Sequence, residues 1–213
     1  MNEYLAALEA MVSNPLKEIY KKLEPIKYGS YNEKTKSFTN RIDDKNYKDI
    51  RILTPQETLK YKIGTCYEQS ILTAYLAKQY GCDYNCVYYL NIGGNTHLTC
   101  NVQYQSKWYW IEHAWGNRRN TYGPFNTLED INTLTCKYWF EQYKLPILFI
   151  KPNFNVSKFF NGKHMNTEIT DMYPEKCIDI MGYKNDNQIK DIQTNKNHKI
   201  TSITLKNGKV IKV

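Results

Sequence analysis

Apolar residues recur at spacings of three and four in several stretches of this chain, a pattern typical of helices. One such stretch begins at Asn14-Pro15, where proline suits the first helical turn, and another ends at Gly81, a suitable residue after a helix. Thr54 precedes a proline and has glutamate three residues further on, which is a helix-start signal. The predicted helices are Asn2–Val12, Pro15–Leu23, the segment that begins after Thr54, Thr65–Tyr80 and Leu128–Tyr143.

Between these helices the hydrophobic period changes to two, which is typical of strands. Gln105 and Ser106 separate two alternating stretches and predict a hairpin, and Asn207-Gly208 predicts a second hairpin near the end. From Pro25 to Asp49 the chain is polar, and we expect a loop with one short strand. The predicted strands are Cys86–Leu90, His97–Tyr104, Lys107–Glu112, Ile147–Ile150, Ile200–Leu205 and Val210–Val213.

This order of elements predicts an α+β fold. A helical N-terminal part precedes a cysteine-bearing helix, which is expected to pack on an antiparallel sheet. With 213 residues the chain is long enough for one domain and a small appendage. The signals weaken beyond Lys151, so we expect a domain over residues 1–150 and a β-rich extension over residues 151–213.

The N-terminal residues lack the basic segment and the apolar run of a signal peptide. No stretch approaches the 18 apolar residues that indicate a membrane-spanning helix. Six cysteines in a chain of this length, without a secretory signal, are typical of reduced thiols. We therefore expect a cytoplasmic protein with no membrane partner.

The formal net charge is +8, and most of the excess lies in the last third of the chain. Residues 151–213 contain 11 basic and 6 acidic residues, a difference of +5, and their lysines are dispersed. Dispersed lysines are typical of a solvated surface. A nucleic-acid partner stays open as an alternative, although no nucleic-acid motif supports it.

Three residues supply the parts of an activated thiol nucleophile. Cys66 falls in the first turn of a predicted helix, where unpaired N–H groups and the helix dipole favour a thiolate. His97 begins the following strand pair and Glu112 ends it. An imidazole accepts the thiol proton, and a carboxylate orients the imidazole and stabilises its protonated form. The alternatives are an inert buried thiol at Cys66 and a half-exposed strand residue at Glu112.

The register of the hairpin decides which histidine faces Glu112. With a two-residue loop, Thr99 lies opposite Glu112. His97 then shares a sheet face with Glu112 as a diagonal neighbour within reach of a hydrogen bond, and His113 points to the other face. A shift of one residue would exchange the two histidines.

The order of these residues resembles that of the transglutaminase-like superfamily of papain-fold thiol enzymes. In that family cysteine lies on a helix, and histidine and aspartate lie on the two strands that follow. Gly64-Thr65-Cys66, His97 and Trp110-Ile111-Glu112 match this order within residues 54–130, with glutamate in place of aspartate. The resemblance implies a papain-like catalytic core within residues 1–150, with Cys66 as nucleophile. Many bacterial members are hydrolases rather than crosslinkers, so a bacterial or phage hydrolase is expected.

A zinc site is the alternative use of some of these residues. Cys82, Cys86, His97 and Cys100 have a spacing that zinc ligands can adopt. Strand alternation argues against it, because Cys100 should point away from His97. We expect no metal and no cofactor, and interpret the remaining cysteines as structural thiols.

Aromatic residues gather around the predicted sheet, where most are expected to pack in the core. We expect Trp110 and Trp115, which flank the candidate carboxylate, and Tyr67, which follows the candidate nucleophile, to contact the substrate. Arg118 and Arg119 lie in the loop that follows. They could bind an acidic substrate or phosphate, or belong to a plain surface loop.

These observations predict a cysteine-nucleophile enzyme that acts on amide or acyl bonds of a protein or peptide substrate, as a peptidase, amidase or deamidase. Hydrolysis is favoured over transfer, because nothing in the sequence marks a site for a second amine. The main alternative is a non-catalytic module of the same fold that binds a protein or nucleic acid.

Overall fold

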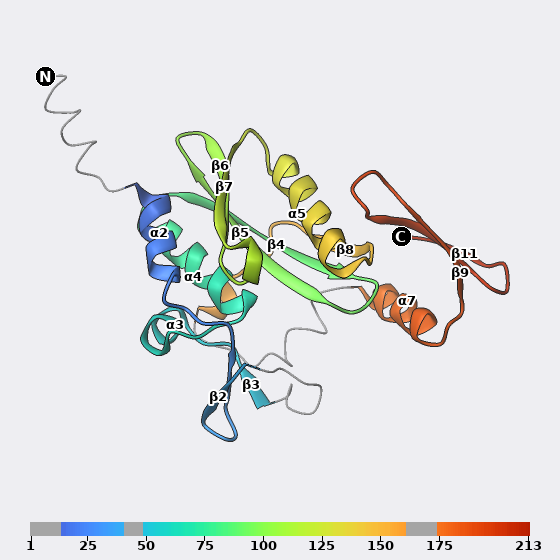
Figure 1. The fold of residues 1–213 in the computed structure, drawn as a ribbon, viewed down its shortest axis with the longest axis horizontal. Helices are drawn as coiled ribbons and strands as arrows, with labels where there is room; N and C mark the ends of the chain where they lie inside the picture. Colours follow the sequence, from blue (N-terminus) through green and yellow to red (C-terminus); the bar gives the residue numbers. More distant parts are fainter. Residues whose placement is uncertain (1–13, 41–48, 161–173) are drawn as a thin grey trace, which may run out of the picture.

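The computed structural model describes residues 14–40, 49–160 and 174–213 (Figure 1). Its mixture of helices and antiparallel sheets confirms the α+β class. The expected helix Asn2–Val12 lies outside the described residues. No helix in the described ranges combines the length and the apolar character needed to cross a membrane. The helices are α2 (Pro15–Leu23), α3 (Pro55–Tyr61), α4 (Cys66–Gln79), α5 (Leu128–Tyr143) and α7 (Glu175–Asn185), with short 3-10 helices η2 (Gly116–Arg118) and η3 (Ser157–Phe159).

A five-stranded sheet forms the centre of the molecule. Its strands follow the order β7-β6-β5-β4-β8, and every neighbouring pair is antiparallel. Consecutive strands are therefore neighbours from β4 to β7, while β8 returns to the far edge beside β4. The strands are β4 (Asp83–Asn91), β5 (Thr96–Tyr104), β6 (Lys107–Glu112), β7 (Asn120–Phe125) and β8 (Ile147–Lys151).

The β5–β6 hairpin has the register expected from its two-residue loop. Tyr104 pairs with Lys107 and Asn101 pairs with Trp110, without a bulge between them. Gln105 and Ser106 both have positive φ, at 50° and 59°, as a tight turn between twisted strands requires. This register places the beginning of β5 beside the end of β6, at one end of the sheet.

Helices cover both faces of this sheet (Figure 1). On one face, Leu72 of α4 packs with Val102 of β5 in a buried cluster, and on the other face Trp139 of α5 packs with Tyr89 of β4. The sequence predicted one apolar face for α4, yet most of its side chains are buried. The reason is that α2 and α3 pack against α4 in addition to the sheet.

Two segments contain more strands than the sequence predicted. The polar stretch after Pro25 forms β1 (Ser30–Asn32) and β2 (Ser37–Thr39), which join β3 (Ile50–Arg51) in a small antiparallel sheet. These strands have two or three residues, too few to show an alternating pattern. Strand β7 contains Gly123-Pro124, which suggests a loop in a sequence, but an edge strand tolerates proline because one side of it needs no donors.

The C-terminal extension is a helix followed by a three-stranded sheet in the order β11-β10-β9, with β9 (Ile189–Thr194), β10 (Ile200–Leu205) and β11 (Val210–Lys212). The hairpin at Asn207-Gly208 is confirmed, whereas α7 and β9 were not expected. Ile180 and Ile203 of the extension belong to the same buried cluster as Leu90 and Leu148 of the central sheet. The core therefore continues across residue 150, and the division into two domains stays a prediction.

Candidate active site

Cys66 is the first residue of α4 and is almost completely buried, with 4% of its surface exposed. The preceding Thr65 caps the helix: its hydroxyl accepts hydrogen bonds from the N–H groups of Tyr67 and Glu68. The Glu68 carboxylate in turn accepts from the Thr65 N–H and hydroxyl, completing a capping box. This cap holds the helix start, and with it the thiol, in one position.

His97 lies between the thiol and a carboxylate. Its Nε2 is 2.8 Å from Oε2 of Glu112, and Cys66 is also near enough to act on the pKa of His97. The second carboxylate oxygen of Glu112 accepts the backbone N–H of Trp115 at 2.8 Å. Both oxygens of Glu112 are thus occupied, and His97 lies between Cys66 and Glu112 as one series.

The surroundings of His97 favour its charged form. Burial by itself lowers the pKa of His97, but the charge of Glu112, the neighbouring Cys66 and the hydrogen bond to Glu112 outweigh burial and raise the pKa from 6.5 to about 10. His97 therefore carries a proton at neutral pH.

His113 lies on the opposite face of the sheet, as the register predicts. Its Nδ1 is 2.9 Å from Oε1 of Gln69, and its ring packs edge-on against Tyr20. Burial and then the charge of Arg119 lower the pKa of His113 from 6.5 to about 4. A neutral histidine held by α2 and α4 takes no part in the series that includes Cys66.

A cavity of about 290 Å³ opens beside the thiol and the imidazole. Four of its ten lining residues are tyrosine or tryptophan. Trp115 and Trp139 both lie against the His97 ring, with ring centres 5.2 and 5.3 Å away. The cavity gives a substrate access to Cys66 and His97. It is lined by Tyr28, Cys66, Thr96, His97, Ala114, Trp115, Gly116, Arg119, Trp139 and Tyr143.

The three residues expected to contact the substrate lie in different surroundings. Trp115 lines the cavity. Trp110 is completely buried and stacks on Tyr122, with ring centres 4.8 Å apart, so it is a core residue. Tyr67 is buried behind Thr96, with its hydroxyl 3.4 Å from the threonine hydroxyl. Direct substrate contact thus fits the position of Trp115 and not those of Trp110 and Tyr67.

Other cavity residues were not expected from the sequence. Tyr28 is brought next to Cys66 because its neighbour Lys27 pairs with the chain before the helix: the Lys27 N–H donates to Lys62 O, and the Gly64 N–H donates to Lys27 O. Tyr28 is one of 19 tyrosines and lies in a polar segment, so no local signal marks it. Trp139 follows helical spacing in α5, which predicts core packing rather than a cavity wall.

The proposed zinc ligands do not converge. Cys86 and Cys100 are direct partners on β4 and β5, while His97 has the opposite strand parity to Cys100. Within the described ranges no group of three or more histidine, cysteine, aspartate or glutamate residues is arranged to hold a metal ion.

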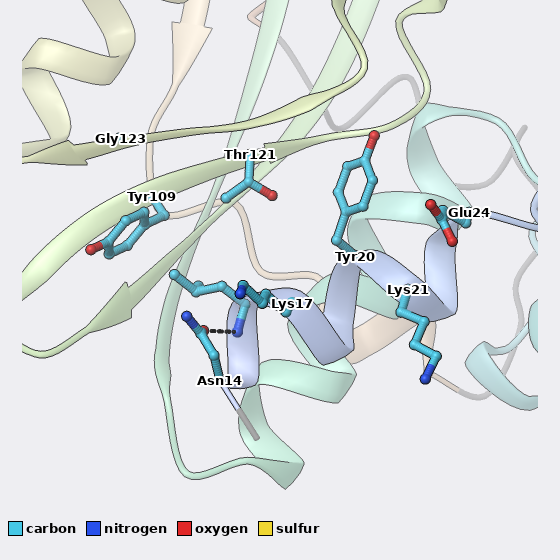
Figure 2. Close-up of a pocket in the computed structure, with 9 residues that line it drawn as sticks. Asn14, Lys17, Tyr20, Lys21, Glu24, Tyr109, Thr121 and Gly123 are labelled. Atoms are coloured by element: carbon cyan, nitrogen blue, oxygen red, sulfur yellow. Dashed lines mark hydrogen bonds between the residues drawn. The ribbon is translucent and has the colours of Figure 1, made fainter. Parts of the chain in front are cut away.

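A second cavity, of about 380 Å³, lies between α2 and the strands β6 and β7 (Figure 2). It is the larger of the two, and its charged residues are Lys17, Lys21 and Glu24. Neither a thiol nor an imidazole lines it, so it lacks the groups for nucleophilic catalysis. We therefore place the candidate active site at the smaller cavity.

No protein-family model matches the chain, and no curated protein has a matching sequence.

Proposed function

We propose that this protein is a thiol hydrolase that acts on amide or related acyl bonds of a protein or peptide substrate. The observation that carries the proposal is that Cys66 and His97 line one open cavity and that Glu112 is hydrogen-bonded to His97. A nucleophile, a base and an orienting carboxylate within contact of one another are the parts that acyl transfer requires.

In the first half of the reaction, the Cys66 thiolate attacks the substrate carbonyl carbon. Thr65 occupies the N–H groups of Tyr67 and Glu68, which leaves the Cys66 N–H in the first helical turn to stabilise the developing oxyanion. Protonated His97 donates its proton to the leaving amine as the C–N bond breaks. The result is a thioester on Cys66, a free amine and a neutral imidazole.

In the second half, neutral His97 takes a proton from a water molecule, and the oxygen attacks the thioester carbonyl. The C–S bond breaks, the acid leaves, and the thiolate and the protonated imidazole are restored. Glu112 stabilises the positive charge of His97 at both ends of this cycle, because its Oε2 stays within hydrogen-bond distance of Nε2.

The arrangement supports the resemblance to the transglutaminase-like superfamily and a papain-like core for the central part of the chain. Cys66 begins a helix that packs on an antiparallel sheet, and His97 and Glu112 lie on the two strands that follow β4. Glutamate replaces the family's aspartate at the third position. The Trp115 N–H holds the second oxygen of the longer side chain, which fixes its orientation toward His97.

The test is the rate at which iodoacetamide alkylates Cys66, followed by mass spectrometry of the Cys66 peptide between pH 5 and pH 9. We expect rapid labelling at pH 6 in the wild type, because the imidazolium maintains a thiolate. His97→Ala and Glu112→Gln should slow labelling at pH 6, the first at least tenfold. Partly exposed Cys82 in the same chain serves as the reference thiol.

Labelling of Cys66 at the slow rate of Cys82, with no effect of His97→Ala, would contradict the proposal. The protein would then be better explained as a binding module, and partner capture would replace the substrate search. If Cys66 labels rapidly, the next step is a screen of peptide and amide substrates with Cys66→Ala as the inactive control.

A further inference from the structure

We propose that Arg119 is a specificity-determining residue that binds a carboxylate of the substrate, so that the preferred substrates are amides with a carboxylate close to the scissile bond. The inference rests on the proposed function, because it assigns a substrate class to the same cavity. The two adjacent arginines, Arg118 and Arg119, lie in different surroundings, and only Arg119 lines the cavity.

Arg118 is held on the side of the loop that faces α5. Its guanidinium forms an ion pair with Glu141 at 2.8 Å and lies 4.0 Å above the ring of Tyr138. Its carbonyl oxygen accepts the Tyr122 hydroxyl at 2.8 Å. Arg118 thus anchors the short helix η2 to the rest of the molecule, and its charge is already paired.

Arg119 lines the cavity that contains Cys66 and His97, and its side chain is exposed. Across the described ranges, no carboxylate forms an ion pair with it. The anchored neighbour Arg118 holds the backbone, so an unpaired guanidinium is presented at the cavity.

The rest of the cavity favours an anionic ligand. Apart from Arg119 and the Cys66–His97 pair, its lining residues are uncharged, and none of them is aspartate or glutamate. The nearest carboxylate, Glu112, is 3% exposed and has both oxygens occupied. A guanidinium beside a cavity without acidic lining residues is suited to binding a carboxylate through two parallel hydrogen bonds.

The test compares two alkylating agents that differ only in charge and need no known substrate. Iodoacetate and iodoacetamide each form a bond from the Cys66 sulfur to their methylene carbon, and iodide leaves. We measure the ratio of the iodoacetate rate to the iodoacetamide rate at Cys66, by peptide mass spectrometry at pH 7 and low salt. The imidazolium of His97 acts on this ratio in every variant, so comparing variants isolates Arg119.

We expect Arg119→Gln to lower this ratio by about 2- to 5-fold, the size of an exposed charge interaction. Arg119→Glu should lower it further, and Arg119→Lys should retain most of it. Lys137→Gln removes one exposed positive charge from α5 and should leave the ratio unchanged. Higher salt should reduce the wild-type ratio toward that of Arg119→Gln.

An unchanged ratio in Arg119→Gln, or an equal loss in Lys137→Gln, would overturn the inference. That result is separate from failure of the proposed function, which is detected as slow, His97-independent alkylation by iodoacetamide alone. A cavity with an activated thiol but no charge preference would keep the hydrolase proposal and remove the carboxylate assignment.

Discussion

Two histidines that are sixteen positions apart, His97 and His113, have opposite protonation preferences. Both are buried, and burial favours the neutral form of each. His97 has a carboxylate 2.8 Å from Nε2, whose charge outweighs burial and keeps the ring protonated. His113 faces the neutral amide of Gln69 and the positive charge of Arg119, so burial prevails. The charge of the partner, more than the depth of burial, therefore separates the roles of the two residues.

His113 should make stability depend on pH below neutrality. Its folded-state pKa of about 4 lies below the ordinary value of 6.5, so the unfolded chain binds more protons between these values. The stabilisation is present above pH 6.5 and is lost as the pH falls toward 4. As the pH falls from 7 to 4, the wild type should lose on the order of 2–3 kcal/mol of its free energy of unfolding through this residue. His113→Asn should not show this loss, so its stability relative to the wild type should improve by the same amount. Urea unfolding at both pH values measures this, and a pH-independent difference would contradict it.

At the scale of the element, the capping box of α4 connects stability to the chemistry. Thr65→Ala removes the hydroxyl that accepts from Tyr67 N–H and donates to the buried Glu68 carboxylate. We expect a loss of about 1–2 kcal/mol in the free energy of unfolding and slower alkylation of Cys66, because the helix start that holds the thiol loosens.

Thr127→Ala is the matched control, because Thr127 caps α5 with the same type of box, away from the thiol. Thr127→Ala should lose a similar free energy of unfolding, about 1 kcal/mol. The rate at which Cys66 is alkylated should not change. Equal slowing in both variants would mean that general destabilisation, rather than the position of the helix start, controls the thiol.

The elements that the sequence predicted well are those with a strong local signal. The two-residue loop at Gln105-Ser106 was enough to set the register of β5 and β6 and to place His97 beside Glu112. Cavity residues such as Tyr28 could not be predicted, because Tyr28 reaches Cys66 through the pairing of Lys27 with a distant segment. Strand β7 was missed for a similar reason, since only its pairing with β6 makes Gly123-Pro124 part of a sheet.

At the scale of the whole molecule, the C-terminal sheet is continuous with the central core. Ile203 is completely buried in a cluster that also contains Leu148, and the Ile147 N–H donates to His198 O at 2.9 Å. Phe140 of α5 stacks on His198, with ring centres 4.0 Å apart. These contacts tie the extension to the elements that carry the candidate site, so the two parts should unfold together.

The tryptophans provide a test of this coupling, because all four lie between residues 108 and 139, outside the extension. Ile203→Ala should lower the free energy of unfolding by about 3 kcal/mol and shift the urea transition seen by tryptophan fluorescence. The shift is expected because a cavity in a shared core destabilises every part packed on it. Val210→Ala, in the same sheet but 58% exposed, should leave the transition in place. If Ile203→Ala changes only the circular dichroism and not the fluorescence transition, the extension folds as a separate unit and the boundary near residue 150 is real.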